Sequence, residues 1–160
     1  MSVAFTREED VEAQAAHLPD RPISPHRNLV TASGLAALDA ELAAARAAFQ
    51  AAQAQGDVSS DRSAMARAAR DLRYWSARRA SAELFEPALA PGAMGFGRTA
   101  SLERDDGRRQ RFRIVGEDEA DAARGSVSYV SPLAKALTGK KAGDVVEVAG
   151  HEIEVVAVEG

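Results

Sequence analysis

Residues 126–148 read Ser-Val-Ser-Tyr-Val-Ser-Pro-Leu-Ala-Lys-Ala-Leu-Thr-Gly-Lys-Lys-Ala-Gly-Asp-Val-Val-Glu-Val, and they contain the signals for a short helix followed by a strand. Ser131 can cap the free amides of a helix, and Pro132 suits the first turn because its φ is fixed and it has no N–H. Gly139 with the two lysines after it ends the helix and places cations at its negative end. The stretch therefore predicts one short helix that begins at Ser131-Pro132.

Strand signals lie on both sides of this helix. Segments rich in β-branched or alternating residues occupy 99–103, 111–115, 145–148 and 153–158. The first two are joined by the turn Asp105-Asp106-Gly107, which is a strong hairpin signal, and the last two by Ala149-Gly150. The C-terminal part of the chain is therefore expected to be a β-sheet built from two hairpins and one short helix.

The middle of the chain predicts two long helices. Between Leu35 and Glu86 there is no Pro and one Gly, Gly56, which marks a single turn. The first helix should begin at Thr31 or Ser33, either of which can cap it, and run to about Gln55. Its apolar positions alternate in steps of three and four, as in a coiled-coil seam: Leu35, Leu38, Leu42, Ala45, Phe49 and Ala52.

The return helix is expected over about residues 61–85. The residues that can line its facing side are Met65, Ala69, Leu72, Ser76, Ala80 and Leu84. At 1.5 Å per residue each helix would be roughly 35 Å long, which predicts an antiparallel finger. Tyr74 and Trp75 are interpreted as packing residues rather than as platforms for stacked bases.

Composition restricts the function classes. The chain has 160 residues, of which 46 % are hydrophobic and 28 % charged, and this balance is ordinary for a globular protein. It has no Cys and no apolar run approaching the roughly 20 residues that span a bilayer, so we expect a cytoplasmic protein without a membrane partner. A net charge of −4 argues against general wrapping of DNA. Residues 1–30, with Pro19, Pro22 and Pro25, are expected to form a flexible acidic and Pro-rich leader with little packing.

Three sequence patterns resemble one protein family. The Ser131-Pro132 segment, the pattern Thr31-x-x-Gly34-x-x-x-Leu38-x-x-Glu41-Leu42, and Phe96-Gly97 with Ile114-Val115-Gly116 are similar to the Gre family of bacterial transcription elongation factors, GreA and GreB. The resemblance covers about residues 31–158. It implies an α+β fold with a coiled-coil finger over 31–88 and an FKBP-like β-sheet domain with one short helix over 94–160, without isomerase activity.

The resemblance also implies a function. In the family, the finger enters the secondary channel of RNA polymerase and regulates elongation while the polymerase itself cleaves backtracked RNA, so the factor is not an enzyme. The partners implied are the polymerase core, the 3′ end of the nascent RNA and the DNA of the elongation complex, and we expect a monomer. The anchoring surface implied is Tyr129, Val130, Ser131, Pro132 and Leu133, where an apolar patch beside a rigid Pro suits a protein contact.

The finger tip departs from the family pattern. No cofactor is expected on the chain alone, but family tips carry carboxylates that share a second Mg²⁺ with the polymerase, and Asp57 matches the first of them. Ser60 stands where the family has Glu, and Asp61 stands at an Asn. Asp57 and Asp61 either share a face and partly replace the usual pair, or Asp61 simply caps the second helix. The finger accordingly either stimulates cleavage or only occupies the channel.

The roles of two charge clusters remain to be assigned, and one other class of protein is an alternative. Arg62, Arg67, Arg70 and Arg73 lie on the return helix, and they form either a solvated face or a basic flank that contacts RNA phosphates or the acidic channel. The acidic residues of 117–121 are interpreted as a solvated loop. A coiled-coil chaperone or an FKBP-like prolyl isomerase would also combine a finger with such a domain.

Overall fold

The computed structural model describes residues 18–55 and 62–160 and divides the chain into two compact units. Within the described residues, the first unit comprises 18–27 and 37–81, and the second comprises 28–36 and 82–160. The expected fold class, a helical hairpin followed by a curled sheet with one short helix, is confirmed. The division differs from the expected boundary at residue 31, because residues 28–36 belong with the sheet.

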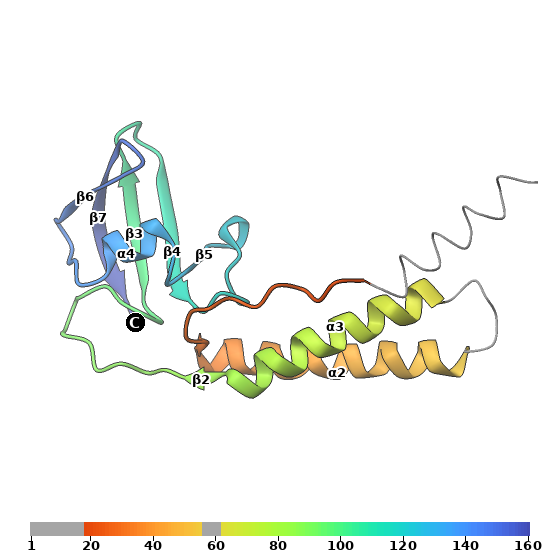
Figure 1. Cartoon of the computed structure of the whole chain (residues 1–160). Coiled ribbons are helices and arrows are strands. Elements are labelled where there is room, and N and C mark those ends of the chain that lie inside the picture. The colour runs from red at the N-terminus through yellow and green to blue at the C-terminus, as the bar shows by residue number, and fades with distance from the viewer. Residues whose placement is uncertain (1–17, 56–61) are drawn as a thin grey trace, which may run out of the picture. The chain divides into compact units, whose positions relative to one another are not determined.

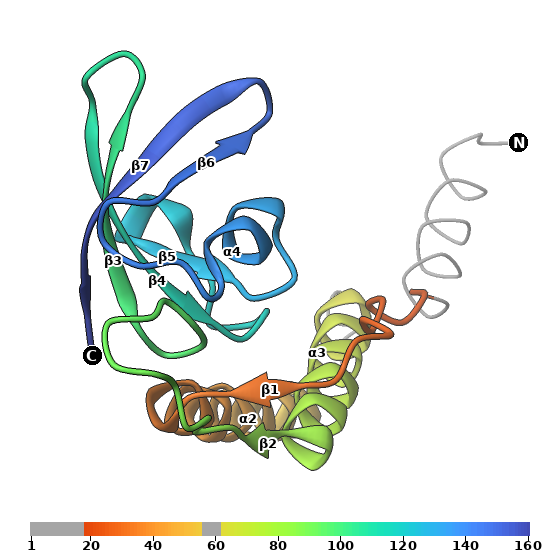
Figure 2. The same cartoon turned by 90° about the vertical axis from the view of Figure 1, so that its left-hand side faces the viewer.

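The first unit is built on two helices, α2 (Ala32–Ala54) and α3 (Arg62–Ser81), which lie side by side (Figures 1 and 2). An ion pair between Asp39 and Arg79 joins them. On α2 the predicted seam is confirmed, because its six positions are the ones that are buried or half-buried between residues 35 and 55. Leu38 and Leu42 are the deepest, at 2 % and 8 % exposed. Burial of this single stripe is what stabilises a helix of this kind.

The return helix follows its prediction less closely. Met65, Ala69, Leu72 and Ser76 are half-buried as expected, but Ala80 and Leu84 are exposed. The helix ends at Ser81 rather than near residue 85, because the chain then extends into a strand. Arg78 is 2 % exposed, so this arginine of α3 is buried despite its charge.

The second unit contains a five-stranded sheet in the order β5-β4-β3-β7-β6. Its strands are β3 (Thr99–Arg104), β4 (Arg109–Val115), β5 (Ser126–Ser128), β6 (Val145–Val148) and β7 (His151–Glu159). The two predicted hairpins, β3 with β4 and β6 with β7, are confirmed, and β3 pairs with β7 to join them. β5 pairs parallel to β4 after a 3₁₀ turn, η1 (Ala122–Arg124), an addition that the sequence did not predict.

The β3–β4 turn is formed by the residues that the sequence singled out. Gly107 has a φ of +82°, a left-handed conformation that favours glycine. Before it, the Asp106 side chain accepts a hydrogen bond from the amide of Arg108, and this bond lowers the pKa of the Asp106 carboxyl. The turn therefore fixes the register in which β3 and β4 pair.

The short helix α4 (Pro132–Leu137) covers one face of the sheet, as Figure 2 shows. Ala134 and Leu137 are fully buried and pack with core residues of the sheet. The largest of these are Leu102, Ile114, Ile153 and Val155, all at most 1 % exposed. Each such side chain contributes about 1.5–3 kcal/mol through burial, so the helix is held firmly on the sheet.

A two-stranded sheet lies where the chain passes into and out of the hairpin. β1 (Leu29–Val30) and β2 (Glu83–Leu84) pair in parallel, although more than fifty residues separate them in sequence. The amide of Phe85 donates to the carbonyl of Val30 at 2.9 Å and extends the pairing. This second sheet was not predicted.

Candidate functional site: a docking face on the second unit

The start of α4 has the geometry that the sequence predicts. The Ser131 hydroxyl accepts a hydrogen bond from the Ala134 amide at 3.2 Å, and Pro132 occupies the first helical turn. Pro132 is exposed, but the four other residues of the expected anchoring patch are half-buried. Leu133 and Tyr129 pack against the core, so the expected patch consists of one exposed proline beside half-buried neighbours, and its role as an anchor stays a prediction.

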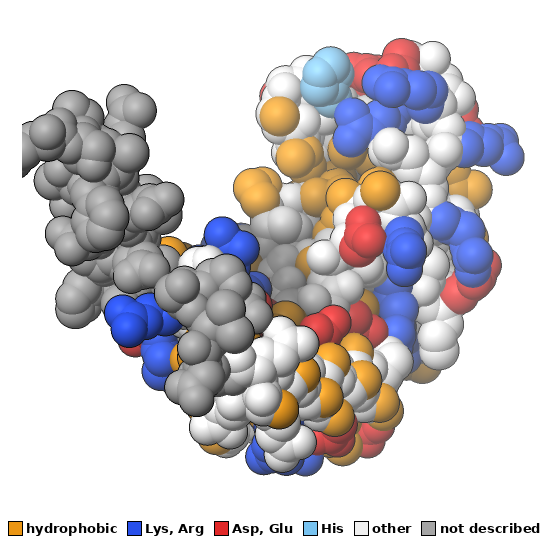
Figure 3. All heavy atoms as spheres, turned by 90° about the vertical axis from the view of Figure 1, so that its right-hand side faces the viewer, with side chains coloured by type: hydrophobic (Ala, Val, Ile, Leu, Met, Phe, Trp, Pro, Cys, Tyr) orange, Lys and Arg blue, Asp and Glu red, His pale blue; other side chains and the backbone are white. Residues whose placement is uncertain are grey.

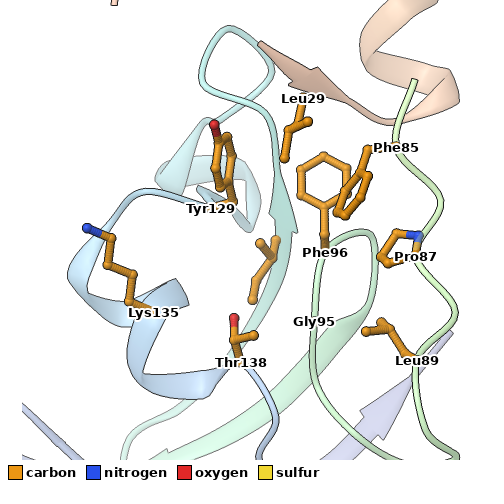
Figure 4. Close-up of a pocket in the computed structure, with 10 residues that line it drawn as sticks. Leu29, Phe85, Pro87, Leu89, Gly95, Phe96, Tyr129, Lys135 and Thr138 are labelled. Carbon is orange, nitrogen blue, oxygen red and sulfur yellow. The ribbon is translucent and has the colours of Figure 1, made fainter. Parts of the chain in front are cut away.

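An apolar cavity of about 440 Å³ lies in the second unit, where Tyr129 before α4 and Lys135 and Thr138 toward the end of that helix line one side of it. Figure 4 shows Phe85 and Phe96 side by side near Leu29, with Tyr129 on the side toward α4. The Phe96 ring meets Phe85 at 5.3 Å and Tyr129 at 5.9 Å between centroids, both edge to face. Such pairs add about 0.5–1.5 kcal/mol beyond burial, which keeps the cavity wall well ordered.

This cavity was not predicted, because residues that are distant in sequence form its wall. The chain has eight aromatic residues, counting five Phe, two Tyr and one Trp, and three of them meet here. The polar groups of the lining side chains are the Tyr129 and Thr138 hydroxyls and the Lys135 ammonium, and Lys135 points away from the cavity (Figure 4). A mostly apolar hollow beside an exposed proline is suited to receive an apolar side chain of a partner protein.

One wall of the cavity is held in place by Arg98. Its guanidinium donates to the carbonyl of Ala93 at 2.6 Å and to that of Ala90 at 2.7 Å, and it also approaches the carbonyl of Leu89. The charged donor therefore satisfies carbonyls of an irregular segment that has few backbone partners. The segment from Pro87 to Gly95 is thereby fixed against the sheet.

Glu119 fixes the first turn of α2 within the second unit. Its carboxylate accepts hydrogen bonds from the Thr31 hydroxyl at 2.6 Å and the Ser33 hydroxyl at 2.7 Å, and Arg113 lies 3.5 Å away. Thr31 also accepts a bond from the Gly34 amide at 3.0 Å, so Thr31 is the cap that the sequence offered as one of two choices. The interpretation of residues 117–121 as a solvated loop is therefore wrong for Glu119.

The pattern Thr31-x-x-Gly34 follows from this contact. A Cβ on Gly34 would lie 2.5 Å from a carboxylate oxygen of Glu119, so only glycine lets the carboxylate approach the helix start. Negative charge at a helix N-terminus is favourable as well. The sequence motif therefore encodes a side-chain contact that no local rule could have predicted.

The arginines of α3 are placed differently from one another. Arg62, Arg67 and Arg73 are exposed, whereas Arg70 is half-buried, with its Nε buried, lacking a hydrogen-bond partner and 3.7 Å from Asp71. On the face of the molecule in Figure 3, basic and acidic side chains are interspersed rather than gathered in one basic field. Arg70 and Arg73 have carboxylate neighbours, Asp71 and Asp20, and the role of the four arginines stays a prediction.

Residues 18–27 pack more than the sequence suggested. The Arg21 guanidinium lies 3.9 Å from the centre of the Tyr74 ring and 3.4 Å from Asp71, and Asp20 pairs with Arg73 at 2.6 Å. The expectation of a leader with little packing is therefore corrected for these residues, because Arg21 contacts both an aromatic ring and a carboxylate.

The carboxylates of the finger tip lie outside the described residues. This concerns Asp57 and Asp61, with Ser60 between them, and the Mg²⁺ role that the resemblance gives to Asp57. Across 18–55 and 62–160, no group of three or more His, Asp or Glu side chains could hold a metal ion. In the same residues no helix is both long enough and apolar enough to cross a membrane.

Comparison with known proteins supports the resemblance. The family model described as transcription elongation factor, GreA/GreB, C-term matches residues 89–160. GreA of Phenylobacterium zucineum is 37 % identical over 137 residues, which are 74 % of this chain and 86 % of that protein. GreB of Neisseria meningitidis serogroup B is 40 % identical over 96 residues, 56 % of this chain and 59 % of that protein. This chain thus spans between half and three fifths of several of these relatives.

Two solved structures are similar to this chain. Gfh1 of Thermus aquaticus is 26 % identical with a TM-score of 0.39 and covers 84 % of this chain and all of that one. A GreA/GreB factor of Nitrosomonas europaea is 17 % identical with a TM-score of 0.39, covering 81 % and 97 %. The sequence identity to the Phenylobacterium relative decides the assignment. The chain belongs to the GreA/GreB family of transcription elongation factors.

Proposed function

We propose that this protein binds the core of bacterial RNA polymerase in the cytoplasm and regulates elongation through the secondary channel, with the nascent RNA and the DNA of the elongation complex as its neighbours. The second unit docks on the polymerase through Pro132 and the adjoining cavity, and the hairpin of α2 and α3 enters the channel. In this role the chain is a monomeric factor, and any RNA cleavage is carried out by the polymerase itself.

The exposed Pro132 at a capped helix start carries this proposal. It lies inside the part of the chain that matches the family model, three residues after Tyr129, which lines the apolar cavity together with Phe85 and Phe96. Exposed apolar groups beside a well-ordered hollow are common at protein interfaces. The relatives, which are the transcription elongation factors GreA and GreB, supply the partner class.

Pro132→Asp is expected to weaken polymerase binding more than tenfold, which corresponds to about 1.4 kcal/mol. The side chain is exposed, and an aspartate in the first turn of a helix is favourable, so the fold should be retained. The measurement is the affinity for core polymerase by surface plasmon resonance, with circular dichroism to check folding.

Ala142→Asp is the matched control, because Ala142 is also exposed and lies in the turn before β6. It adds the same charge to the same unit and should leave the affinity unchanged. Equal affinity for Pro132→Asp and the natural protein, both folded, would show that the docking face lies elsewhere.

The tip supports a second candidate function, a factor that occupies the channel without stimulating cleavage. With Ser60 in place of the family's Glu, one oxygen ligand for a shared Mg²⁺ is missing, and Mg²⁺ held by fewer carboxylates binds more weakly. We expect weak or absent cleavage by the natural protein, and an increase of at least about tenfold for Ser60→Glu with Asp61→Asn. The measurement is the release of 3′ RNA fragments from a backtracked elongation complex.

Asp57→Asn separates the two tip functions. If Asp57 holds the shared metal, this change abolishes the cleavage that the Ser60→Glu, Asp61→Asn variant gains. Strong cleavage by the natural protein that Asp57→Asn leaves unaltered would contradict the carboxylate assignment. Binding to the polymerase, measured alongside, should be the same for all tip variants.

A further inference from the structure

Residues 18–27, here called the strap, are held on α3 by contacts of two adjacent residues, Asp20 and Arg21, of which Arg21 also pairs with Asp71 at 3.4 Å. Arg21 lies over the rings of Tyr74 and Trp75, 3.9 and 5.3 Å from their centres, and the two rings meet edge to face at 4.9 Å. Asp20 pairs with Arg73 at 2.6 Å. These contacts lie within the first unit, so they belong to one compact body.

The strap places a carboxylate where an incoming anion would bind. The Arg73 side chain is 53 % exposed. It pairs with Asp20, which is 53 residues away in sequence. A phosphate oxygen would use the same guanidinium donors as the Asp20 carboxylate. Asp20 takes the Nε donor of Arg73 and places its negative charge beside the remaining donors, so it disfavours a second anion there.

Arg73 lies on one side of α3 together with three other arginines. At about 100° per residue, Arg62, Arg67, Arg70 and Arg73 fall within an arc of roughly 140° on α3. Arg62, Arg67 and Arg73 are exposed. Arg67, Arg70 and Arg73 follow one another at intervals of three residues, about one helical turn. This spacing suits a flexible chain of phosphates better than a single small anion.

We propose that the strap is an autoinhibitory element that competes with single-stranded RNA for this face of α3. The inference rests on the proposed function for the identity of the anion, which is the RNA of the elongation complex. In the free protein Asp20 and Arg21 hold the strap on α3. RNA then binds with the intrinsic affinity of the face multiplied by the fraction of molecules in which the strap is released.

The test uses the full chain and a fluorescein-labelled oligouridylate of about 12 nucleotides, followed by fluorescence anisotropy at about 50 mM salt. Asp20→Asn with Arg21→Gln removes the contacts of both residues and leaves the net charge unchanged. We expect this variant to bind the oligouridylate about fivefold more tightly than the natural protein. Glu103→Gln with Arg109→Gln, which removes an exposed pair at 3.3 Å on β3 and β4, is the charge-matched control and should bind like the natural protein.

Two further measurements separate release of the strap from a general change in charge. Trp75 is the chain's single tryptophan, so its emission reports on the strap. Saturating oligouridylate should change the emission of the natural protein toward that of the strap variant. Arg73→Gln should weaken binding about threefold in the strap variant and less in the natural protein, where Asp20 already occupies Arg73.

The proposal is overturned if the strap variant binds no more tightly than the charge-matched control. It is overturned equally if RNA binds the natural protein without changing the emission of Trp75. Capture of core polymerase tests the proposed function separately, since Pro132 lies in the other unit. Tighter RNA binding by the strap variant without polymerase capture would refute only the proposed function, and polymerase capture without tighter RNA binding would refute only the strap.

Discussion

Gly116→Ala is expected to destabilise the second unit by about 3 kcal/mol, and to lower its melting temperature by on the order of 15 °C. A Cβ on Gly116 would run into the carbonyl oxygen of Leu29, well inside contact distance. That carbonyl belongs to β1, whose place is fixed by pairing with β2, so the backbone has little freedom to move away. The measurement is thermal unfolding followed by circular dichroism.

Gly107→Ala is the comparison that tests this steric explanation. Gly107 has a φ of +82° but open space around it, so an alanine there meets only the backbone penalty of about 1–2 kcal/mol. Gly116 does not have a positive φ, and its cost comes from the crowded contact with Leu29. A larger loss of stability for Gly107→Ala than for Gly116→Ala would contradict the close approach described for β1.

Leu42→Asp is expected to cost more than about 3 kcal/mol in the hairpin, because it buries a charge in the seam between α2 and α3. Leu42 is 8 % exposed, and the seam is the main apolar stripe of α2. Hydrogen exchange should therefore rise along both helices, toward the rates of local unfolding. Exchange over residues 95–158 should stay slow, since these residues belong to the other unit.

Ala43→Asp is the matched control for the hairpin. Ala43 is the next residue along α2 and is exposed, so the same charge meets water there and should change stability by less than about 0.5 kcal/mol. If Leu42→Asp raises exchange equally in both units, the two units do not unfold independently.

Periodicity predicted the parts of the fold in which one face is buried. The α2 seam was correct at all six positions because an amphipathic helix needs a repeat of three and four. Ser131-Pro132 and Gly107 were correct because caps and turns depend on local backbone chemistry. These features share one property, which is that each is encoded by neighbouring residues.

Contacts between distant segments could not be predicted in this way. β1 and β2 have two residues each and show no pattern, so their pairing depends on tertiary packing alone. Glu119 looked like one member of an acidic loop until Thr31 and Ser33 were placed against it. Leu84 lies beyond the end of α3 at Ser81 and is exposed, and helix propensity did not show that end.

In the candidate site, too, features encoded by neighbouring residues were predicted and contacts between distant segments were not. The helix start at Pro132 was predicted, because a capping residue and a proline are local signals. The aromatic wall of Phe85 and Phe96 was not, because it is assembled from residues of a connecting segment that has no periodicity. The tip residue Asp57 stays a prediction, as do the roles of the exposed arginines Arg62, Arg67 and Arg73.

The pairing of β1 with β2 makes the hairpin an insertion in the second unit. The chain leaves that unit after β1 and returns to it at β2, and the two strands lie one hydrogen-bonded step apart. An insertion whose ends are adjacent can change in length or sequence without moving the strands of its host. The sequence of the hairpin, including the chemistry of its tip, can therefore change during evolution while the core of the second unit stays the same.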